Sequence, residues 1–186
     1  MSTGHAFAST SSPHSSAAAR LLQRQLKEMR TSQDLTGISV GLVRESNVFE
    51  WEVILMINDD CKYYGGAYFR AIMYFPPEYP HLPPRIVFQN PVPFHPNIYP
   101  SGDLCISILH APGDDMYGYE SAAERWSPVQ TPETILLSVL SLFNEPNDES
   151  AANLDAAKLL RAEKEGGPKE FRKRVRQCVR ESLGEN

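Results

Sequence analysis

The segment at 95–109, HPNIYPSGDLCISIL, constrains this chain more than any other stretch of its sequence. It places Cys105 ten positions after His95, in a loop-rich and otherwise apolar context. The proline after His95 favours extended backbone at the histidine, whereas Gly102 permits a turn. The chain can therefore double back and bring Asn97 near Cys105.

Cys105 is the candidate nucleophile and acyl carrier. A thiolate can attack an activated carbonyl, and a neighbouring amide can stabilise the resulting oxyanion, which contributes about 3 to 4 kcal/mol in other enzymes. A thiol with the reference pKa of about 8.5 is already a few per cent thiolate at neutral pH, so it needs little beyond positioning. The alternative is a buried, inert thiol, which is a common state of free cysteine.

His95 has three alternative roles. It could act as a general base, as in a cysteine protease, or as a metal ligand. Its place before Pro-Asn instead favours a ring that hydrogen-bonds to the backbone and braces the turn. We predict this structural role.

Length and composition predict one domain, preceded by a disordered Ser/Ala-rich tail at 1–16 and followed by a short tail at 183–186. The net charge of -5 argues against broad nucleic-acid binding, and no apolar run is long enough to span a bilayer. Three cysteines without CxxC spacing indicate neither a disulfide framework nor a zinc ribbon. These features favour a soluble protein of the cytoplasm, with the nucleus as a second compartment.

Hydrophobic periodicity predicts an α+β domain in which helices pack around an antiparallel sheet. An amphipathic helix at 17–29 precedes four segments rich in β-branched and aromatic residues, which we predict to form a meander. A central helix begins at Pro132 after the cap Thr131. The predicted strands are 38–43, 48–57, 67–75 and 85–88, and two further helices are predicted at 151–162 and 168–182.

Several motifs resemble the ubiquitin-conjugating enzymes. That family's signature is HPN, a cysteine ten residues after the histidine, and then tryptophan and Ser-Pro, all of which occur here. FPPEYPHLPPRIVF at 75–88 and TPETILLSVLSLFNEPN at 131–147 are similar to two further family segments. The motifs occur in the family's order, and the resemblance covers residues 17–182.

The resemblance implies the ubiquitin-conjugating fold: an N-terminal helix, a four-stranded meander sheet, a central helix and two C-terminal helices. It implies an acyltransferase that accepts ubiquitin as a thioester on Cys105 from the activating enzyme. The enzyme would pass ubiquitin to a lysine of a substrate or of ubiquitin, or to a ligase cysteine, and would support polyubiquitin chain formation without a metal or cofactor. A carrier of another ubiquitin-like modifier is the closest alternative, and a cysteine hydrolase or an inactive ubiquitin-binding relative is more distant.

The resemblance also assigns roles to other residues. Asn97 would serve the oxyanion or support its loop, although it could simply make its own Asx turn. Basic residues of the first helix would bind the activating enzyme, whereas the alternative is a solvated helix face. The activating-enzyme residues are Arg20, Arg24 and Lys27, and the ligase-binding residues are His81, Ser127 and Pro128.

More residues separate Cys105 from the next tryptophan than in the commoner family pattern, which indicates an insertion at 110–124. An acidic surface loop is usually only solvated. This one resembles the acidic loop of one subclass, which influences the approach of the acceptor lysine. The predicted acceptor-guiding residues are His110, Asp114, Asp115 and Glu120, together with Ser107 and Ser150, which stand where many family members carry aspartate.

Overall fold

The computed structural model describes residues 16–32, 35–111 and 125–185. Within these ranges the chain forms one four-stranded antiparallel sheet and four α-helices, which confirms the predicted α+β class. The elements are α1 (Ala17–Thr31), β1 (Ile38–Arg44), β2 (Asn47–Met56), β3 (Tyr68–Tyr74), β4 (Arg85–Phe88), the 3₁₀ helix η2 (Ser107–Leu109), α2 (Pro132–Asn144), α3 (Leu154–Lys164) and α4 (Glu170–Ser182).

The sheet is a meander in the order β1-β2-β3-β4, as the sequence predicts. Its two faces differ because successive side chains of a strand point to opposite sides. On β3, Phe69, Ala71 and Met73 are buried, whereas Tyr68 and Arg70 are exposed. One face of the sheet therefore belongs to the core.

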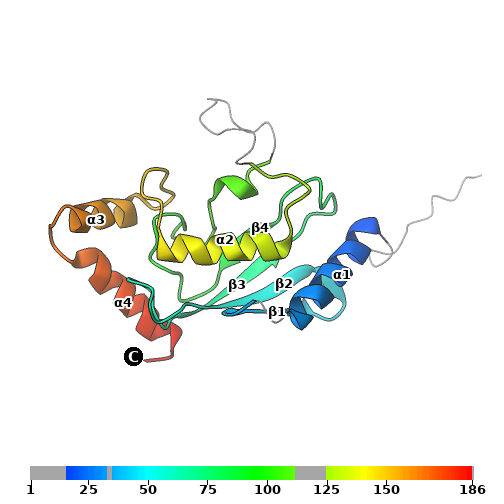
Figure 1. The fold of residues 1–186 in the computed structure, drawn as a ribbon, viewed down its shortest axis with the longest axis horizontal. Coiled ribbons are helices and arrows are strands. Elements are labelled where there is room, and N and C mark those ends of the chain that lie inside the picture. Colours follow the sequence, from blue (N-terminus) through cyan, green and yellow to red (C-terminus); the bar gives the residue numbers. More distant parts are fainter. Residues whose placement is uncertain (1–15, 33–34, 112–124, 186) are drawn as a thin grey trace, which may run out of the picture.

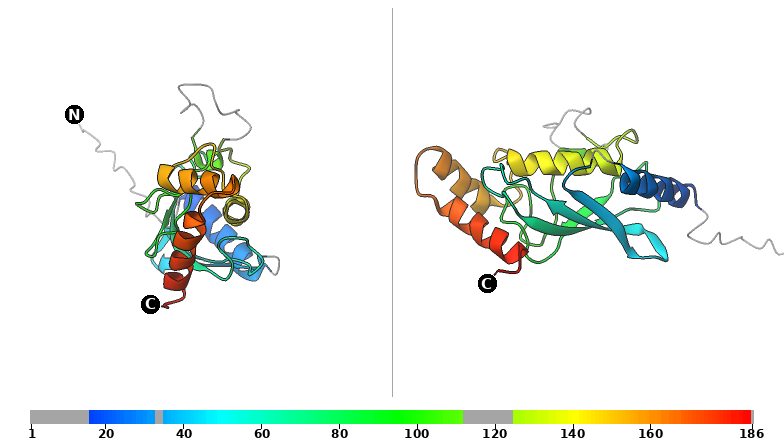
Figure 2. Two further views of the ribbon diagram at one scale, coloured as in Figure 1. Left: turned by 90° about the vertical axis from the view of Figure 1, so that its left-hand side faces the viewer. Right: turned by 60° about the horizontal axis from the view of Figure 1, so that its bottom comes forward.

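Helix α2 lies across this face, while α1 lies at one end of the molecule and α3 and α4 lie at the other (Figures 1 and 2). Thr131 caps α2 through a capping box with Thr134, and Pro132 occupies its first turn. The apolar stripe that the sequence predicts for this helix includes Ile135 and Phe143, both of which are fully buried. The central helix thus covers the sheet that supports the candidate site.

The ring of Phe143 joins the core to the candidate site. It stacks on Phe69 with a centroid distance of 5.4 Å and meets Tyr64 edge to face at 5.1 Å. On the side of the site it meets the imidazole of His95 at 5.2 Å. Since all these side chains are fully or almost fully buried, the histidine is part of the hydrophobic core.

The two C-terminal helices differ from prediction at their first residues. Helix α3 starts at Leu154 because Asn153 accepts a hydrogen bond from the backbone N–H of Ala156, which caps the helix. Helix α4 starts at Glu170, two residues after the predicted start at 168. The other elements begin and end within about two residues of their predicted bounds.

Gly102 makes the turn that precedes Cys105. Its φ is +96°, and a Cβ there would collide with the backbone oxygen of Phe88 on β4. Gly166 has a similar φ of +87° but nothing within 4 Å of the position of an added Cβ. Comparing alanine substitutions at Gly102 and Gly166 therefore separates the cost of the backbone conformation from the cost of the collision.

We predict that Gly102→Ala destabilises the protein more than Gly166→Ala does. Gly166→Ala should lower the free energy of unfolding by about 1 to 2 kcal/mol, because it forces alanine into left-handed backbone. Gly102→Ala adds the collision with β4, and each further 1 kcal/mol should lower the melting temperature by about 2 to 4 °C. Equal melting temperatures for the two variants, measured by calorimetry, would contradict the tight approach of Gly102 to β4.

Candidate active site

The segment that carries Cys105 folds back on itself as the sequence predicts. The backbone N–H of Cys105 donates to the carbonyl of Asn97 at 2.9 Å. Closer to the turn, the N–H of Tyr99 donates to the carbonyl of Asp103 at 2.9 Å, and that of Gly102 donates to the carbonyl of Tyr99 at 2.8 Å. Backbone hydrogen bonds therefore hold Asn97 beside Cys105.

The sheet holds this folded segment in place. The N–H of Phe88 donates to the carbonyl of Gly102 at 2.8 Å, and the N–H of Leu104 donates to the carbonyl of Ile86 at 3.0 Å. Arg85 also pairs with the carboxylate of Asp103. The last strand of the sheet thus sets the position of the residue that precedes Cys105.

His95 is fully buried and uses both of its ring nitrogens. Its Nδ1 accepts a hydrogen bond from the backbone N–H of Asn97 at 2.9 Å, and its Nε2 lies 3.1 Å from the carbonyl oxygen of Leu142 in α2. An Nδ1 that accepts carries no proton, so the neutral ring must be protonated on Nε2, which donates to Leu142. Burial lowers the pKa of His95 from its ordinary value of 6.5 to about 4.

The side chain of Asn97 binds the loop that follows α2. Its Nδ2 donates to the carbonyl oxygens of Asn147 at 2.8 Å and Ser150 at 3.1 Å, and its Oδ1 accepts from the N–H of Asn147 at 3.0 Å. Both amide protons are therefore engaged with the loop. Of the two roles left open by the sequence, this geometry favours loop support over direct donation to an oxyanion.

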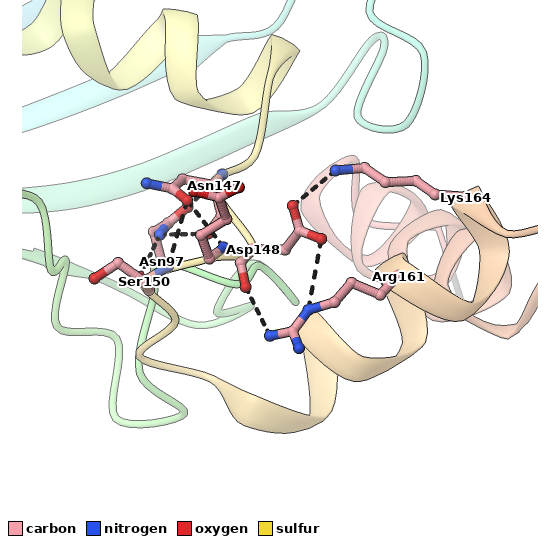
Figure 3. A network of polar contacts seen from close by, with 7 residues as sticks. Asn97, Asn147, Asp148, Ser150, Arg161 and Lys164 are labelled. Carbon is pink, nitrogen blue, oxygen red and sulfur yellow. Dashed lines mark hydrogen bonds and ion pairs between the residues drawn. The ribbon is translucent and has the colours of Figure 1, made fainter.

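A second set of bonds fixes the same loop from helix α3 (Figure 3). The carboxylate of Asp148 lies 2.7 Å from Nζ of Lys164 and 3.6 Å from Nε of Arg161, and Arg161 also donates to the backbone carbonyl of Asp148 at 2.7 Å. The hydrogen bond from Lys164 holds the pKa of Asp148 below its usual value. Asn97 and α3 thus hold the 147–150 loop from opposite sides (Figure 3).

Cys105 is half-buried and lines a cleft of about 390 Å³. Nε2 of His110 lies 3.6 Å from its sulfur. The hydroxyl of Tyr99 is also close enough to interact with the thiol, and the charge of a thiolate there raises the pKa of Tyr99. The cleft is lined by Pro84, Arg85, Tyr99, Asp103, Leu104, Cys105, Leu109 and His110.

Sequence reasoning missed Tyr99. The signal was present, because Tyr99 lies two residues after Asn97 in a segment predicted to fold back toward Cys105. The other two cysteines have different surroundings. Cys61 is buried with its thiol 3.4 Å from the carbonyl oxygen of Phe143, and burial raises the pKa of the Cys178 thiol.

The acceptor-guiding residues predicted from the sequence separate into two groups. His110 lies beside Cys105, whereas Ser107 in η2 and Ser150 in the loop after α2 do not line the cleft. Asp114, Asp115 and Glu120 lie outside the described residues. The backbone N–H of Trp126, which follows the insertion, donates to the carbonyl of His110 at 3.1 Å, so the described residues on its two sides meet.

The predicted ligase-binding residues come together in space. Nε1 of Trp126 donates to the carbonyl of Pro80 at 2.9 Å, which joins the loop of His81 to the loop of Ser127 and Pro128. His81 and Pro128 are exposed. Leu82 and Val129 are exposed apolar neighbours that extend this surface. Sequence reasoning missed both.

The predicted activating-enzyme residues Arg20, Arg24 and Lys27 are exposed along α1. Their spacing places them on one stripe of the helix. Arg24 also makes an exposed ion pair with Glu28 at 3.6 Å. This stripe lies at the end of the molecule opposite α4 (Figure 1).

Comparison with known proteins identifies the family. The family model described as ubiquitin-conjugating enzyme matches residues 21–179. The chain is a member of the ubiquitin-conjugating enzyme family. It is 52% identical to ubiquitin-conjugating enzyme E2 15 of Schizosaccharomyces pombe, over 91% of this chain and 97% of the relative. It is 50% identical to human ubiquitin-conjugating enzyme E2 G2, over 90% of this chain and 97% of the relative.

A solved structure agrees with this assignment. Human ubiquitin-conjugating enzyme E2 G1 superimposes with a TM-score of 0.61 at 37% identity, over 73% of this chain and 99% of that one. The chain is therefore a transferase of the ubiquitin pathway with the ubiquitin-conjugating fold. Its family implies ubiquitin, an activating enzyme and ligases as partners. The comparisons support this function and not the alternative modifier carrier or hydrolase.

Two other site types were sought in the part of the chain that the structure describes. It contains no group of three or more His, Cys, Asp or Glu side chains that could hold a metal ion. None of the helices in the same ranges has both the length and the apolar character needed to cross a bilayer.

Proposed function

We propose that this ubiquitin-conjugating enzyme carries ubiquitin on the sulfur of Cys105. The supporting observation is the setting of that sulfur, which is half-buried in a cleft beside His110 and Tyr99. Cys105 attacks the ubiquitin thioester on the activating enzyme, whose thiolate leaves. An acceptor amine or ligase thiol then attacks the ubiquitin carbonyl on Cys105, and the Cys105 thiolate leaves.

Asn97 positions the acceptor side of this site by holding the 147–150 loop. The support for this role is that both of its amide protons bind carbonyls of that loop. Ser150 itself supplies one of these carbonyls, so its backbone, and not only its hydroxyl, takes part in the arrangement. His95 supports Asn97 in turn by accepting its backbone N–H.

The surfaces around the site complete the proposal. The α1 stripe of Arg20, Arg24 and Lys27 docks the activating enzyme, and the joined loops of His81, Ser127 and Pro128 dock ligases. The insertion, with Asp114, Asp115 and Glu120, guides acceptor lysines by charge attraction near Cys105. The hydrogen bond between the backbone of Trp126 and that of His110 joins the described residues on the two sides of this segment.

The first prediction from this proposal concerns Cys105. Cys105→Ala should abolish charging with ubiquitin in the presence of ATP and activating enzyme. Cys105→Ser should instead accumulate an oxyester that resists reductant, because an alkoxide is a poorer leaving group than a thiolate. Cys178→Ala, which changes a thiol outside the cleft, should charge normally. A reductant-sensitive ubiquitin adduct on Cys105→Ala, seen by gel mobility, would refute the assignment.

A second prediction separates the two roles of Asn97. Asn97→Ala should charge with ubiquitin but discharge to free lysine about tenfold to a hundredfold more slowly, since aminolysis depends on the geometry around the tetrahedral intermediate. If Asn97 acts through the 147–150 loop, Asp148→Asn should also slow discharge to lysine, while leaving charging with ubiquitin intact. Single-turnover discharge of precharged enzyme measures both.

The outcome for Asp148→Asn decides between the roles. Normal discharge in this variant, together with slow discharge in Asn97→Ala, would assign Asn97 to the oxyanion. Equal losses of charging and discharge in Asn97→Ala would instead mean that the whole segment at 95–109 has moved. Circular dichroism of each variant checks that the fold is retained.

A further inference from the structure

A second groove is lined by other segments of the chain than the Cys105 cleft. It has a volume of about 540 Å³ and lies between α4 and the connection from β2 to β3. Figure 1 shows α4 at the end of the molecule opposite α1. None of the roles assigned above uses this groove.

The groove is strongly basic in a chain whose net charge is -5. Asp59 is the single carboxylate among its described lining residues. Its cationic lining residues are Lys62, Lys169, Arg172, Lys173, Arg176 and Arg180. The acidic character of the whole protein is therefore reversed at this place.

Two of these six cations lie within ion-pair distance of a carboxylate. Arg172 pairs with Glu163 at 3.1 Å, and Lys173 lies 3.9 Å from Glu170. Within residues 16–32, 35–111 and 125–185, no carboxylate forms an ion pair with the remaining four cations. These four are Lys62, Lys169, Arg176 and Arg180. A cluster of unpaired like charges repels itself, and an anion that neutralises it would be favoured.

The lining also includes apolar side chains. Cys61 and Tyr63 are almost fully buried, and the partly buried Val179 lines the groove from α4. Nζ of Lys62 lies 4.9 Å from the ring centroid of Tyr63, and the guanidinium carbon of Arg172 lies 5.5 Å from it. The groove therefore offers an apolar surface bordered by cations.

We propose that this groove binds an acidic segment of a partner protein, with an apolar side chain against Val179 and carboxylates against the surrounding cations. Its volume suits a few side chains of a peptide, because binding pockets measure about 300 to 1,000 Å³. A flat bilayer surface would reach only the rim of such a concave site. A nucleic acid is disfavoured because its long polyanionic backbone would also approach the acidic remainder of the protein.

The proposed segment should bind without blocking ubiquitin loading. The groove lies on α4, whereas the stripe proposed for the activating enzyme lies on α1 at the other end of the fold (Figure 1). The groove lining and the Cys105 cleft share no residue. The site would therefore recruit a partner while the enzyme carries ubiquitin.

The test uses the full chain and a fluorescein-labelled peptide of Asp and Glu with one central Leu. Fluorescence anisotropy should show saturable binding that weakens as salt increases. Arg176→Gln with Arg180→Gln should weaken binding about tenfold, because two charge contacts are lost. Replacing the peptide's Leu with Ser should also weaken binding, since it removes the apolar contact.

The matched control is Lys158→Gln with Arg174→Gln. These residues are also exposed cations of α3 and α4, and the double change removes the same charge, but neither side chain lines the groove. The control should bind the peptide like the unmodified protein. Both double variants should still charge Cys105 with ubiquitin, which verifies that the catalytic site is intact.

Several outcomes would overturn the proposal. Equal weakening in the groove variant and the control would show attraction to net charge alone. Binding to phosphatidylserine vesicles that requires Arg176 and Arg180, without binding of the peptide, would assign the groove to a membrane. Absence of binding to either probe would refute an acidic-segment site. None of these results depends on whether Cys105 is the ubiquitin carrier.

Discussion

The buried imidazole of His95 is the constraint on which the candidate site depends. It joins the carbonyl of Leu142 in α2 to the N–H of Asn97, and its ring also packs against Phe143 in the core. A charged ring would have to give up solvation and would lose Nδ1 as an acceptor. The native protein therefore holds the neutral form.

This preference links the fold to pH. Unfolded His95 has its ordinary pKa of 6.5, whereas the native pKa is about 4. Between these values the unfolded chain binds more protons, so stability decreases as pH falls from 6.5 towards 4. The total loss from this one group is about 3 kcal/mol and is complete below the native pKa. At neutral pH the ring is therefore neutral and makes its hydrogen bonds to Asn97 and Leu142.

The site itself joins parts of the chain that are far apart in sequence. Asn97 binds Asn147 and Ser150, the carbonyl of Pro96 accepts from the N–H groups of Ala152 and Asn153, and α3 reaches Asp148 from the other side. Asn153 also caps α3, so the same short segment ends the loop and starts the helix that holds it. Cys105 is positioned by β4, which hydrogen-bonds to Gly102 and Leu104. Cys105 and the 147–150 loop are therefore fixed by different parts of the core.

Local chemistry explains which features could be predicted from the sequence. The strands follow from their β-branched and aromatic residues, the central helix from Thr131 and Pro132, and the turn at Gly102 from a glycine that permits it. The side-chain direction of Asn97 could not be predicted, because its partners lie 50 residues further along the chain. The start of α3 was missed for a similar reason, since several polar residues precede it and only the structure shows which one caps it. The groove at α4 depends on the packing of two distant segments and has no local signature.

The most direct test of this account is the protonation state of His95 in the folded protein, measured from the ¹⁵N chemical shifts of its ring by NMR across a pH series. We expect a neutral ring at pH 7, with the proton on Nε2 and none on Nδ1. This state should persist until the pH approaches about 4. A proton on Nδ1, or conversion to imidazolium close to the ordinary pKa of 6.5, would contradict the proposal that this ring braces Asn97 and the Cys105 segment.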